Sequence, residues 1–312
     1  MNDTQFTAAD DRFHFESMSD RWWETETCWF SFFDPDRRLG GWMYTMVRPN
    51  IGTVSGGTWI WDGSGYLPWE VRYSANYATL RLPRDQDLTD IQLPTGVYIR
   101  AVEPLTTYEF GHRDEPHLVA DLRFEASIPP QALQSVGSAF GHATHFDQLG
   151  RVTGRLVLDG EPIEIDCYSM RDRTWGPRPE HRPRHTAYVT GATGPDHGFL
   201  GVTDSSNPAD PITHGFYLRD GESSPIASGN RSVRRHAELG WVTEIEVRGK
   251  DALGREFHAV GRDLSHIIIN RHSMIDSNSL IEWELDGVRG WGEDQDLWPM
   301  LAWSRQRRKG WA

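Results

Sequence analysis

The sequence predicts an all-β protein made of two barrel-like or sandwich-like domains with few short helices. Short runs rich in aromatic and β-branched residues recur at intervals of roughly 8 to 12 residues, the spacing of sandwiches and barrels. No stretch carries the periodicity of a convincing long helix. A segment rich in proline and arginine, residues 176–185, separates two β-rich halves. We therefore expect one domain over residues 1–176 and a second over residues 177–312.

The first half is expected to begin with one helical turn over residues 17–24 and to continue as strands. Residues 27–33 and 41–47 flank the turn residues 34–36 (Asp-Pro-Asp) and predict a hairpin. Further strands are predicted over residues 56–63, 69–73, 78–82, 97–102, 106–112 and 117–126. A short helix over residues 129–140 then precedes two strands, 150–158 and 161–167, which an Asp159–Gly160 turn joins.

The second half continues the β pattern and ends in a short helix over residues 298–306, where Pro299 is tolerated in the first turn. Its predicted strands cover residues 186–190, 198–202, 215–219, 240–248, 256–261, 265–269, 279–285 and 287–292. No repeat with a period of roughly 20 to 50 residues is visible, which argues against a propeller or a solenoid.

The charge and composition of the chain argue against some classes of binding partner. The 312 residues carry a formal net charge of −13, and the pI is near 5.4. We expect neither nucleic acid nor an anionic membrane as the main partner, because both favour clustered lysine and arginine. The single basic run, Arg305 to Lys309, is interpreted as a solvated tail.

Targeting signals and cysteine use indicate a cytoplasmic protein. The N-terminal residues 1–11 are polar and acidic and lack the features of a secretory signal, and no stretch approaches 18 apolar residues, so no membrane span is expected. Two cysteines, Cys28 and Cys167, cannot form a disulfide framework and fit a reducing compartment. A homodimer is left open.

The most informative stretch runs from Cys167 to Pro179. Three charges, Arg171, Asp172 and Arg173, follow the predicted strand directly and precede Trp175. Arginine and aspartate are rarely buried unless they are paired, so this cluster is either a structural corner or a site. Asp172 is the first candidate for a catalytic acid or base. The alternative is that Asp172 only neutralises the two arginines.

A second constellation is His142-x-x-His145-x-Asp147. On a helix the two imidazoles would share a face, and with Asp147 they would form a two-histidine, one-carboxylate metal site. As pocket-lining acid–base groups, His142 and His145 are the second and third catalytic candidates. The alternative is that they are a pair of polar residues in a loop before a strand.

Candidate substrate-binding residues come from the central cluster and from aromatic and polar side chains along the predicted strands. Fourteen tryptophans suit either thick sheet cores or an aromatic cavity for an apolar guest. The candidates are Trp175, Arg171, Arg173, Tyr168, Trp59, Trp61, Tyr108, His272 and Trp283.

Motifs for the commonest cofactor-dependent and nucleophilic enzymes are missing. The sequence has no Gly-x-Ser-x-Gly elbow, no phosphate-binding Gly-x-x-x-x-Gly-Lys and no Gly-x-Gly-x-x-Gly between a strand and a helix. We therefore expect no cofactor.

The central stretch resembles a known family. Residues 150–154 (Gly-Arg-Val-Thr-Gly), the Asp159–Gly160 turn and residues 171–178 (Arg-Asp-Arg-Thr-Trp-Gly-Pro-Arg) resemble the carotenoid hydratase and AttH-like proteins and their uncharacterised bacterial relatives. Residues 281–284 and 290–293 are similar to the closing hairpin of that family. The resemblance covers most of the chain, although the specific motif spans about a dozen residues.

This resemblance implies two tandem lipocalin-like barrels and conversions of bulky apolar molecules. It implies hydration of isolated double bonds in terpenoids and cyclisations that need little beyond a shaped pocket. In the hydratases a histidine stands two residues before the tryptophan, where this chain has Arg173. Arginine does not give up its proton, so acid catalysis does not carry over to that position, whereas Trp175 and Gly176 match.

The leading hypothesis is a cofactor-independent lyase (hydratase or dehydratase) or an isomerase or cyclase. Its substrate would be a hydrophobic terpenoid, steroid or polyketide-like small molecule, converted by acid–base chemistry in an aromatic pocket. One alternative is a non-catalytic carrier or sensor of lipophilic ligands. The other is a metal-dependent oxygenase built on His142, His145 and Asp147.

Overall fold

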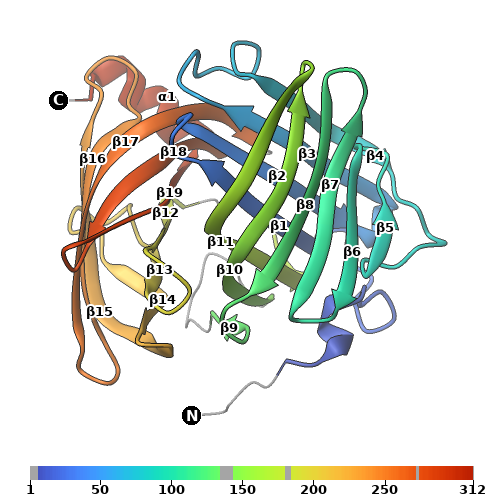
Figure 1. The fold of residues 1–312 in the computed structure, drawn as a ribbon, viewed down its shortest axis with the longest axis horizontal. Coiled ribbons are helices and arrows are strands. Elements are labelled where there is room, and N and C mark those ends of the chain that lie inside the picture. The colour runs from blue at the N-terminus through green and yellow to red at the C-terminus, as the bar shows by residue number, and fades with distance from the viewer. Residues whose placement is uncertain (1–5, 134–142, 180–183, 272–273, 312) are drawn as a thin grey trace.

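The computed structural model describes residues 6–133, 143–179, 184–271 and 274–311. These residues form one large curved sheet followed by one closed barrel (Figure 1). The predicted all-β fold of two lipocalin-like units is confirmed. In the described part of the chain no helix is long and apolar enough to cross a bilayer.

The sheet has eleven antiparallel strands, ten of them in the order β4-β3-β2-β1-β11-β10-β8-β7-β6-β5, with β9 beside β10. Their bounds are β1 Glu24–Asp34, β2 Leu39–Arg48, β3 Thr53–Trp61, β4 Tyr73–Arg81, β5 Asp90–Gln92, β6 Val97–Glu103, β7 Thr107–Asp114, β8 Leu118–Ala126, β9 Gln131–Ala132, β10 Thr144–Leu158 and β11 Glu161–Pro177. Two 3₁₀ turns, Ala8–Asp11 and Pro49–Ile51, accompany them.

The barrel closes in sequence order from β12 to β19. Its strands are β12 Thr186–Ala192, β13 Gly198–Thr203, β14 Ile212–Arg219, β15 Glu222–Arg235, β16 Val242–Asp251, β17 Glu256–Arg271, β18 Met274–Leu285 and β19 Val288–Pro299, and the helix α1 Met300–Lys309 follows. The sheet ends at Pro177 and the barrel begins at Thr186, while a domain boundary after residue 176 stays a prediction.

Three apolar clusters organise the molecule. The first fills the hollow of the curved sheet. Across this hollow, strands that are distant in the sheet are linked by hydrogen bonds to the ring of His112 on β7. Thr58 Oγ1 of β3 lies 2.9 Å from this ring and the Tyr73 hydroxyl of β4 lies 2.8 Å from it. The third fills the barrel. The second joins side chains of both units, including Trp42 and Leu200, and so lies between sheet and barrel.

Several predicted elements differ from the structure in extent. The predicted strands 69–73 and 78–82 are replaced by the single strand β4. Likewise 256–261 and 265–269 are one strand, β17, with a register shift between Asp263 and Ser265 that the sequence suggested as a break. The polar strand β15 was not predicted, because most of its side chains are exposed and show no apolar alternation.

Of the three predicted helices, only the C-terminal one is an α-helix in the described part of the chain. The C-terminal helix exists but starts at Met300 instead of Trp298. Of the predicted helix 129–140, residues 131–132 are strand and 134–140 lie outside the described residues. Residues 17–24 contain turns, and β1 begins at Glu24.

The predicted Asp159–Gly160 turn is confirmed and sets the register of the central hairpin. Both residues have positive φ, 49° and 83°, as a two-residue type I′ turn requires. From this turn β10 and β11 pair continuously from Leu158–Glu161 to Thr144–Trp175. Residues 171–175 therefore lie within a 17-residue strand, not beyond its end as the sequence suggested.

Candidate acid–base site between the sheet and the barrel

The site begins with two neighbouring strands of the sheet. His145 and Asp147 are two residues apart on β10, so their side chains share a face. On β11, Thr174 pairs with His145 and Asp172 pairs with Asp147. On the other side of β11, Asp172 pairs with Trp29 of β1, so Asp147, Asp172 and Trp29 are aligned across three strands. Trp29 belongs to the cluster between sheet and barrel, so this face is the one turned to the barrel.

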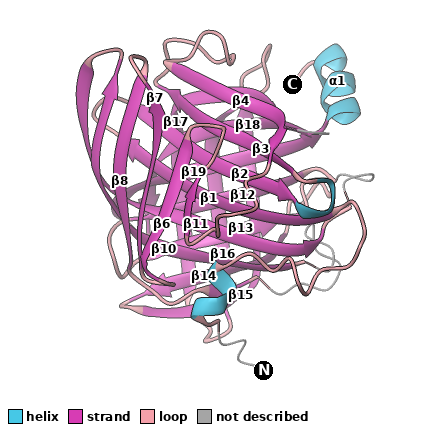
Figure 2. Cartoon of the chain, turned by 90° about the vertical axis from the view of Figure 1, so that its right-hand side faces the viewer, coloured by secondary structure: helices cyan, strands magenta, loops and turns pink. Residues whose placement is uncertain are grey.

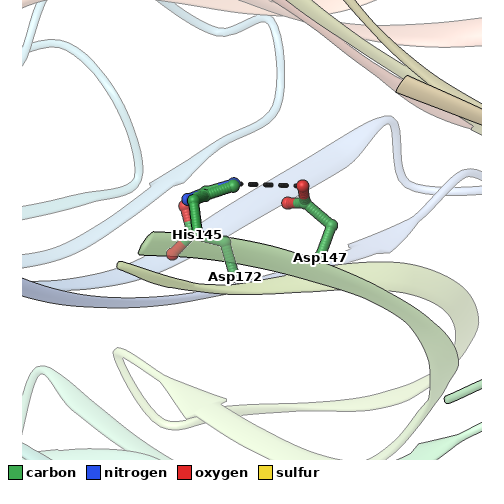
Figure 3. Close-up of side chains that lie close together, drawn as sticks. All are labelled: His145, Asp147 and Asp172. Carbon is green, nitrogen blue, oxygen red and sulfur yellow. Dashed lines mark hydrogen bonds and ion pairs between the residues drawn. The ribbon is translucent and has the colours of Figure 1, made fainter. Parts of the chain in front are cut away.

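Hydrogen bonds fix the histidine at both ring nitrogens. His145 Nε2 lies 3.0 Å from Asp147 Oδ2, and Nδ1 lies 2.6 Å from Thr174 Oγ1. Figure 3 shows the Asp172 carboxyl beside the same ring, on the side away from Asp147. His145 and Asp147 are fully buried, whereas Asp172 keeps part of its surface exposed. Asp172 is thus the least buried residue of the trio, although its Oδ1 atom is itself buried and has no hydrogen-bond partner among the described residues.

Burial shifts the pKa values of all three groups and brings that of Asp172 toward neutral pH. It raises the pKa of Asp172 to about 6, with Asp147 adding to the rise and His145, Arg178 and Arg271 opposing it. Burial also raises the pKa of Asp147 well above its ordinary value and lowers that of His145 to about 4. Uncharged His145 and a readily protonated Asp172 are therefore the stable forms.

The barrel also contributes charged side chains, Arg271 and Asp276, to the same interface. The guanidinium of Arg271 on β17 lies 4.8 Å from the ring centre of Tyr44 and 5.9 Å from that of Trp42. One of its nitrogens lies 3.7 Å from Asp276 Oδ2 on β18. Arg271 also lowers the pKa of Asp172, so its charge acts on a carboxyl of the sheet and on one of the barrel.

Two further buried acids stand on the barrel side. Glu293 on β19 accepts a hydrogen bond from the Trp42 indole at 2.6 Å and one from the Asn278 amide at 3.3 Å. Burial raises the pKa of Glu293 to about 8 and that of Asp276 to about 7. Glu293 Oε1 and both Asp276 carboxylate oxygens have no hydrogen-bond partner among the described residues. The sequence pointed to Glu293 only within the hairpin motif of residues 290–293.

Aromatic side chains surround these polar groups. Trp29 makes an edge contact with Tyr188 of the barrel at 6.0 Å between ring centres, and Trp42 contacts Trp59 and Trp61 in the same manner. In the described part of the chain, the indole N–H groups of Trp29, Trp59 and Trp61 and the Tyr188 hydroxyl have no hydrogen-bond partner. The interface thus offers apolar ring faces together with unused donors and acceptors.

The structure brings together only part of the predicted site. Asp172, His145, Trp59, Trp61 and Tyr168 share the face turned to the barrel. Trp283 lies inside the barrel core. His142 and His272 lie outside the described residues.

The remaining candidates point to the opposite face of the sheet. Arg171 pairs with Asp11 at 3.1 Å and its guanidinium covers the Tyr108 ring at 3.9 Å. Arg173 forms an ion pair with Glu26, and both side chains are buried. The reading of Asp172 as the counter-ion of these arginines is therefore wrong, because alternation along β11 separates them.

Trp175 shares the face of the arginines. Its ring stacks on His14 at 4.5 Å and meets Phe146 edge-on at 6.1 Å. Tyr108, Arg171, Arg173 and Trp175 thus lie on the hollow side of the sheet, apart from the His145 trio.

The trio is also the place where a metal ion could be considered. His145, Asp147 and Asp172 each offer one ligand atom, and these atoms lie within 4.8 Å of one another. However, both ring nitrogens of His145 already have hydrogen-bond partners, and the charges of Arg178 and Arg271 act on Asp172. This arrangement fits proton transfer better than cation binding. The predicted set of two histidines and Asp147 stays a prediction, because His142 lies outside the described residues.

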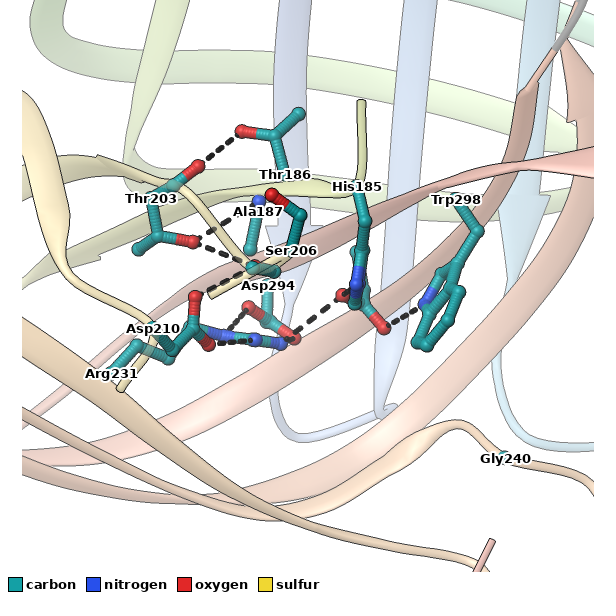
Figure 4. Close-up of polar contacts among 12 residues, drawn as sticks. His185, Thr186, Ala187, Thr203, Ser206, Asp210, Arg231, Gly240, Asp294 and Trp298 are labelled. Carbon is teal, nitrogen blue, oxygen red and sulfur yellow. Dashed lines mark hydrogen bonds and ion pairs between the residues drawn. The ribbon is translucent and has the colours of Figure 1, made fainter. Parts of the chain in front are cut away.

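A second buried charge cluster lies inside the barrel and is fully paired (Figure 4). Arg231 of β15 reaches across to β19 and donates to both carboxylate oxygens of Asp294, at 2.9 and 2.7 Å. Its remaining terminal nitrogen donates to Asp210 at 2.7 Å. Asp296 accepts from His185 and from the Trp298 indole. Because the donors have acceptors, this cluster explains the cohesion of the barrel and not catalysis.

Comparison of the sequence with family models decides the family. The model described as "Domain of unknown function (DUF7064)" matches residues 7–299. The chain belongs to this family. None of the curated proteins matches the chain.

Solved structures share the two-unit fold of this DUF7064 chain. Kievitone hydratase from Nectria haematococca is 10% identical, with a TM-score of 0.56 and 92% of each chain covered. CghA, solved with Sch210972, is 12% identical, with a TM-score of 0.55 and 88% of each chain covered. An AttH-like protein from Nitrosomonas europaea is 12% identical, with a TM-score of 0.51, covering 95% of this chain and 98% of that one. The expected likeness to AttH-like and hydratase structures is confirmed at the level of the fold.

Proposed function

We propose that the chain is an acid–base enzyme that works without a cofactor, a lyase of the hydratase or dehydratase type or an isomerase or cyclase. Its substrate would be a hydrophobic terpenoid, steroid or polyketide-like molecule held between the sheet and the barrel. The observation that carries the proposal is the trio His145, Asp147 and Asp172, buried on an aromatic face with only Asp172 partly accessible.

Asp172 is assigned the proton transfer. A carboxylic acid with a pKa near 6 can both give and take a proton near neutral pH. In the hydration direction, the Asp172 carboxyl protonates one alkene carbon, water adds to the cationic carbon, and the water proton returns to the Asp172 carboxylate. In an isomerisation or cyclisation the proton returns from a substrate carbon instead.

His145 and Asp147 are assigned a positioning role. The bonds from His145 to Thr174 and Asp147 fix the imidazole beside Asp172, where the ring partly offsets the rise that burial causes in the Asp172 pKa. The aromatic rings of Trp29, Trp42 and Tyr44 supply π faces that stabilise a cationic intermediate. Exclusion of bulk water by these rings strengthens each electrostatic contact.

Two of the structural neighbours point in the same direction. One is named a hydratase, and CghA was solved with a bound small molecule. At 10 to 12% identity these likenesses support the fold, and they lend the reaction class its plausibility.

The rival function is a carrier or sensor of lipophilic ligands. The aromatic interface alone would serve a carrier equally well. Four carboxyls with pKa values raised by burial (Asp147, Asp172, Asp276 and Glu293) favour catalysis, because a carrier has no need of desolvated acids.

The test incubates the full-length protein with farnesol, progesterone and naringenin in D₂O and separately in H₂¹⁸O, followed by mass spectrometry. A hydratase adds one water, labelled by ¹⁸O, whereas an isomerase or cyclase incorporates deuterium without adding water. Displacement of anilinonaphthalene sulfonate by the same compounds measures binding. Binding of at least one compound with no label uptake in a broad panel of each substrate class would favour the carrier and overturn the enzyme proposal.

A further inference from the structure

We infer that one end of the molecule, formed by α1 and the β3–β4 loop, docks peripherally on an anionic phospholipid surface. The inference is independent of the proposed reaction. It starts from the basic run that the sequence suggested was only a solvated tail. In the structure the whole of this run, Arg305 to Lys309, is the C-terminal half of α1, which packs on the barrel.

Aromatic packing anchors α1. Trp311, just beyond the helix, contacts Trp298 of β19 and Trp303 of α1, at 5.3 and 4.8 Å between ring centres. Gly240 has φ +87°, and a Cβ there would lie 2.1 Å from the Trp311 ring, so the ring packs directly on the glycine backbone. Arg307 donates to the Glu238 carbonyl at 2.6 Å. The helix is therefore held rigidly on the 236–241 turn.

The β3–β4 loop is attached to the same turn. Tyr66 packs on Trp241 at 5.2 Å, and its carbonyl accepts a hydrogen bond from Ile268 at 2.7 Å. Figure 1 shows this loop beside α1 at the top of the view, and Figure 2 places α1 at the end away from the N-terminal segment. Both elements thus belong to one end of the protein.

This end exposes large apolar side chains. Trp69 is 77% exposed and Leu301 is 73% exposed, the two highest values among the large apolar residues described, and Met300 adds 41%. Tryptophan and leucine are the side chains that interfacial membrane proteins insert at the headgroup level.

The same end carries four cations without carboxylate partners. None of Arg305, Arg307, Arg308 and Lys309 forms an ion pair with a described residue, although most other arginines of the chain are paired. Leu301, Arg305 and Arg308 are spaced to share one helix face. Basic and apolar groups on one face match an anionic lipid surface, which offers both phosphate charge and apolar depth.

The net charge of −13 does not oppose this contact. Charges farther than the Debye length of about 8 Å at physiological salt are largely screened. The local cations of α1 therefore decide the interaction with a surface. With ten residues and about 15 Å of length, α1 lies on the surface and does not span it.

The test is co-sedimentation of the full-length protein with vesicles of phosphatidylcholine alone and with 30% phosphatidylserine. We expect binding to the anionic vesicles only, weakened by high salt. Neutralising three cations (Arg305→Gln, Arg308→Gln and Lys309→Gln) should weaken it roughly 100-fold, since each cation near an anionic surface contributes about five-fold. Trp69→Ser with Leu301→Ser should weaken it at least about ten-fold.

The matched control removes three arginines from exposed strands of the sheet: Arg123→Gln, Arg151→Gln and Arg155→Gln. This variant has the same net charge as the α1 variant and should bind as the wild type does. Thermal unfolding verifies that each variant is folded. Equal binding to both vesicle types, no vesicle binding, or equal loss in the control would overturn the inference. Retention on a soluble polyanion such as heparin without vesicle binding would assign the cations to another partner and also overturn it.

Discussion

Asp172 and Arg173 are adjacent on β11 and serve opposite faces of the sheet. The Arg173 guanidinium is buried in the hollow of the sheet, in an ion pair with Glu26. The Asp172 carboxyl faces the barrel, beside His145 and within the field of Arg271. One strand thus separates a structural ion pair from a candidate catalytic acid, and substitutions at the two positions should have different consequences.

Asp172→Asn should abolish turnover while the protein stays folded. The amide cannot exchange a proton, so label uptake should fall roughly 10² to 10⁴-fold, the usual contribution of a general acid or base. The fold should tolerate the change because the carboxyl is already partly protonated near its pKa of about 6. The measurement is deuterium or ¹⁸O uptake beside a thermal unfolding curve.

Asp166→Asn is the matched control for this prediction. Asp166 lies on the same strand, is largely exposed and pairs with Arg151. Its substitution should leave label uptake unchanged. Retained activity in Asp172→Asn would remove Asp172 from the mechanism.

Arg173→Met should destabilise the fold without altering the residues of the trio. Burial alone would raise the pKa of Glu26, but Arg173 and His14 hold it below its ordinary value. Removing the arginine leaves a buried carboxylate without its main partner, which costs roughly 3 to 5 kcal/mol. Urea denaturation at pH 7 measures the loss.

The double variant Arg173→Met with Glu26→Gln should recover part of that stability, because no charge is then left buried. The exposed pair Arg151–Asp166 gives the comparison, and Arg151→Met should change the unfolding free energy by less than about 1 kcal/mol. A similar small effect for Arg173→Met would show that the buried pair does not hold the sheet.

The metal-dependent oxygenase alternative is also open to a direct check. Because both ring nitrogens of His145 are hydrogen-bonded, we expect the purified protein to contain far less than stoichiometric iron, zinc or manganese. Plasma mass spectrometry measures the content, and EDTA treatment should leave label uptake unchanged. Stoichiometric metal that is lost in Asp147→Asn would reverse the assignment of the trio.

Local patterns predicted the strands, and long-range packing decided the site. The Asp159–Gly160 turn and the aromatic runs of β1 and β2 are local signals, so the all-β fold could be predicted. The length of β11 could not, because charged residues at 171–173 are compatible with a strand only when Asp11 and Glu26 are brought to them from elsewhere.

The extent of β11 also decides on which face of the sheet the side chains of residues 171–173 lie. Had β11 been extended through Trp175, alternation alone would have placed Asp172 apart from Arg171 and Arg173. The barrel half of the interface was beyond sequence reasoning, because Glu293 meets Trp42 across 251 residues. Only the packing of the barrel on the sheet creates that contact.

Glu293→Gln should make the stability of the protein less dependent on pH. Burial raises the pKa of Glu293 from 4.5 to about 8, so the folded state holds this proton more tightly than the unfolded chain. The resulting stabilisation is complete below about pH 4.5 and is lost as pH rises toward 8. The loss amounts to at most roughly 5 kcal/mol, from about 1.4 kcal/mol for each pKa unit. Glutamine has no proton to lose, and its oxygen can still accept a hydrogen bond from the Trp42 indole.

Unfolding free energies measured by urea denaturation between pH 5 and pH 9 should therefore fall less steeply with pH in Glu293→Gln than in the wild type. The exposed Glu164→Gln control should follow the wild type. Parallel curves for wild type and Glu293→Gln would mean that Glu293 is ionised in the folded protein at neutral pH and that Trp42 donates to a carboxylate.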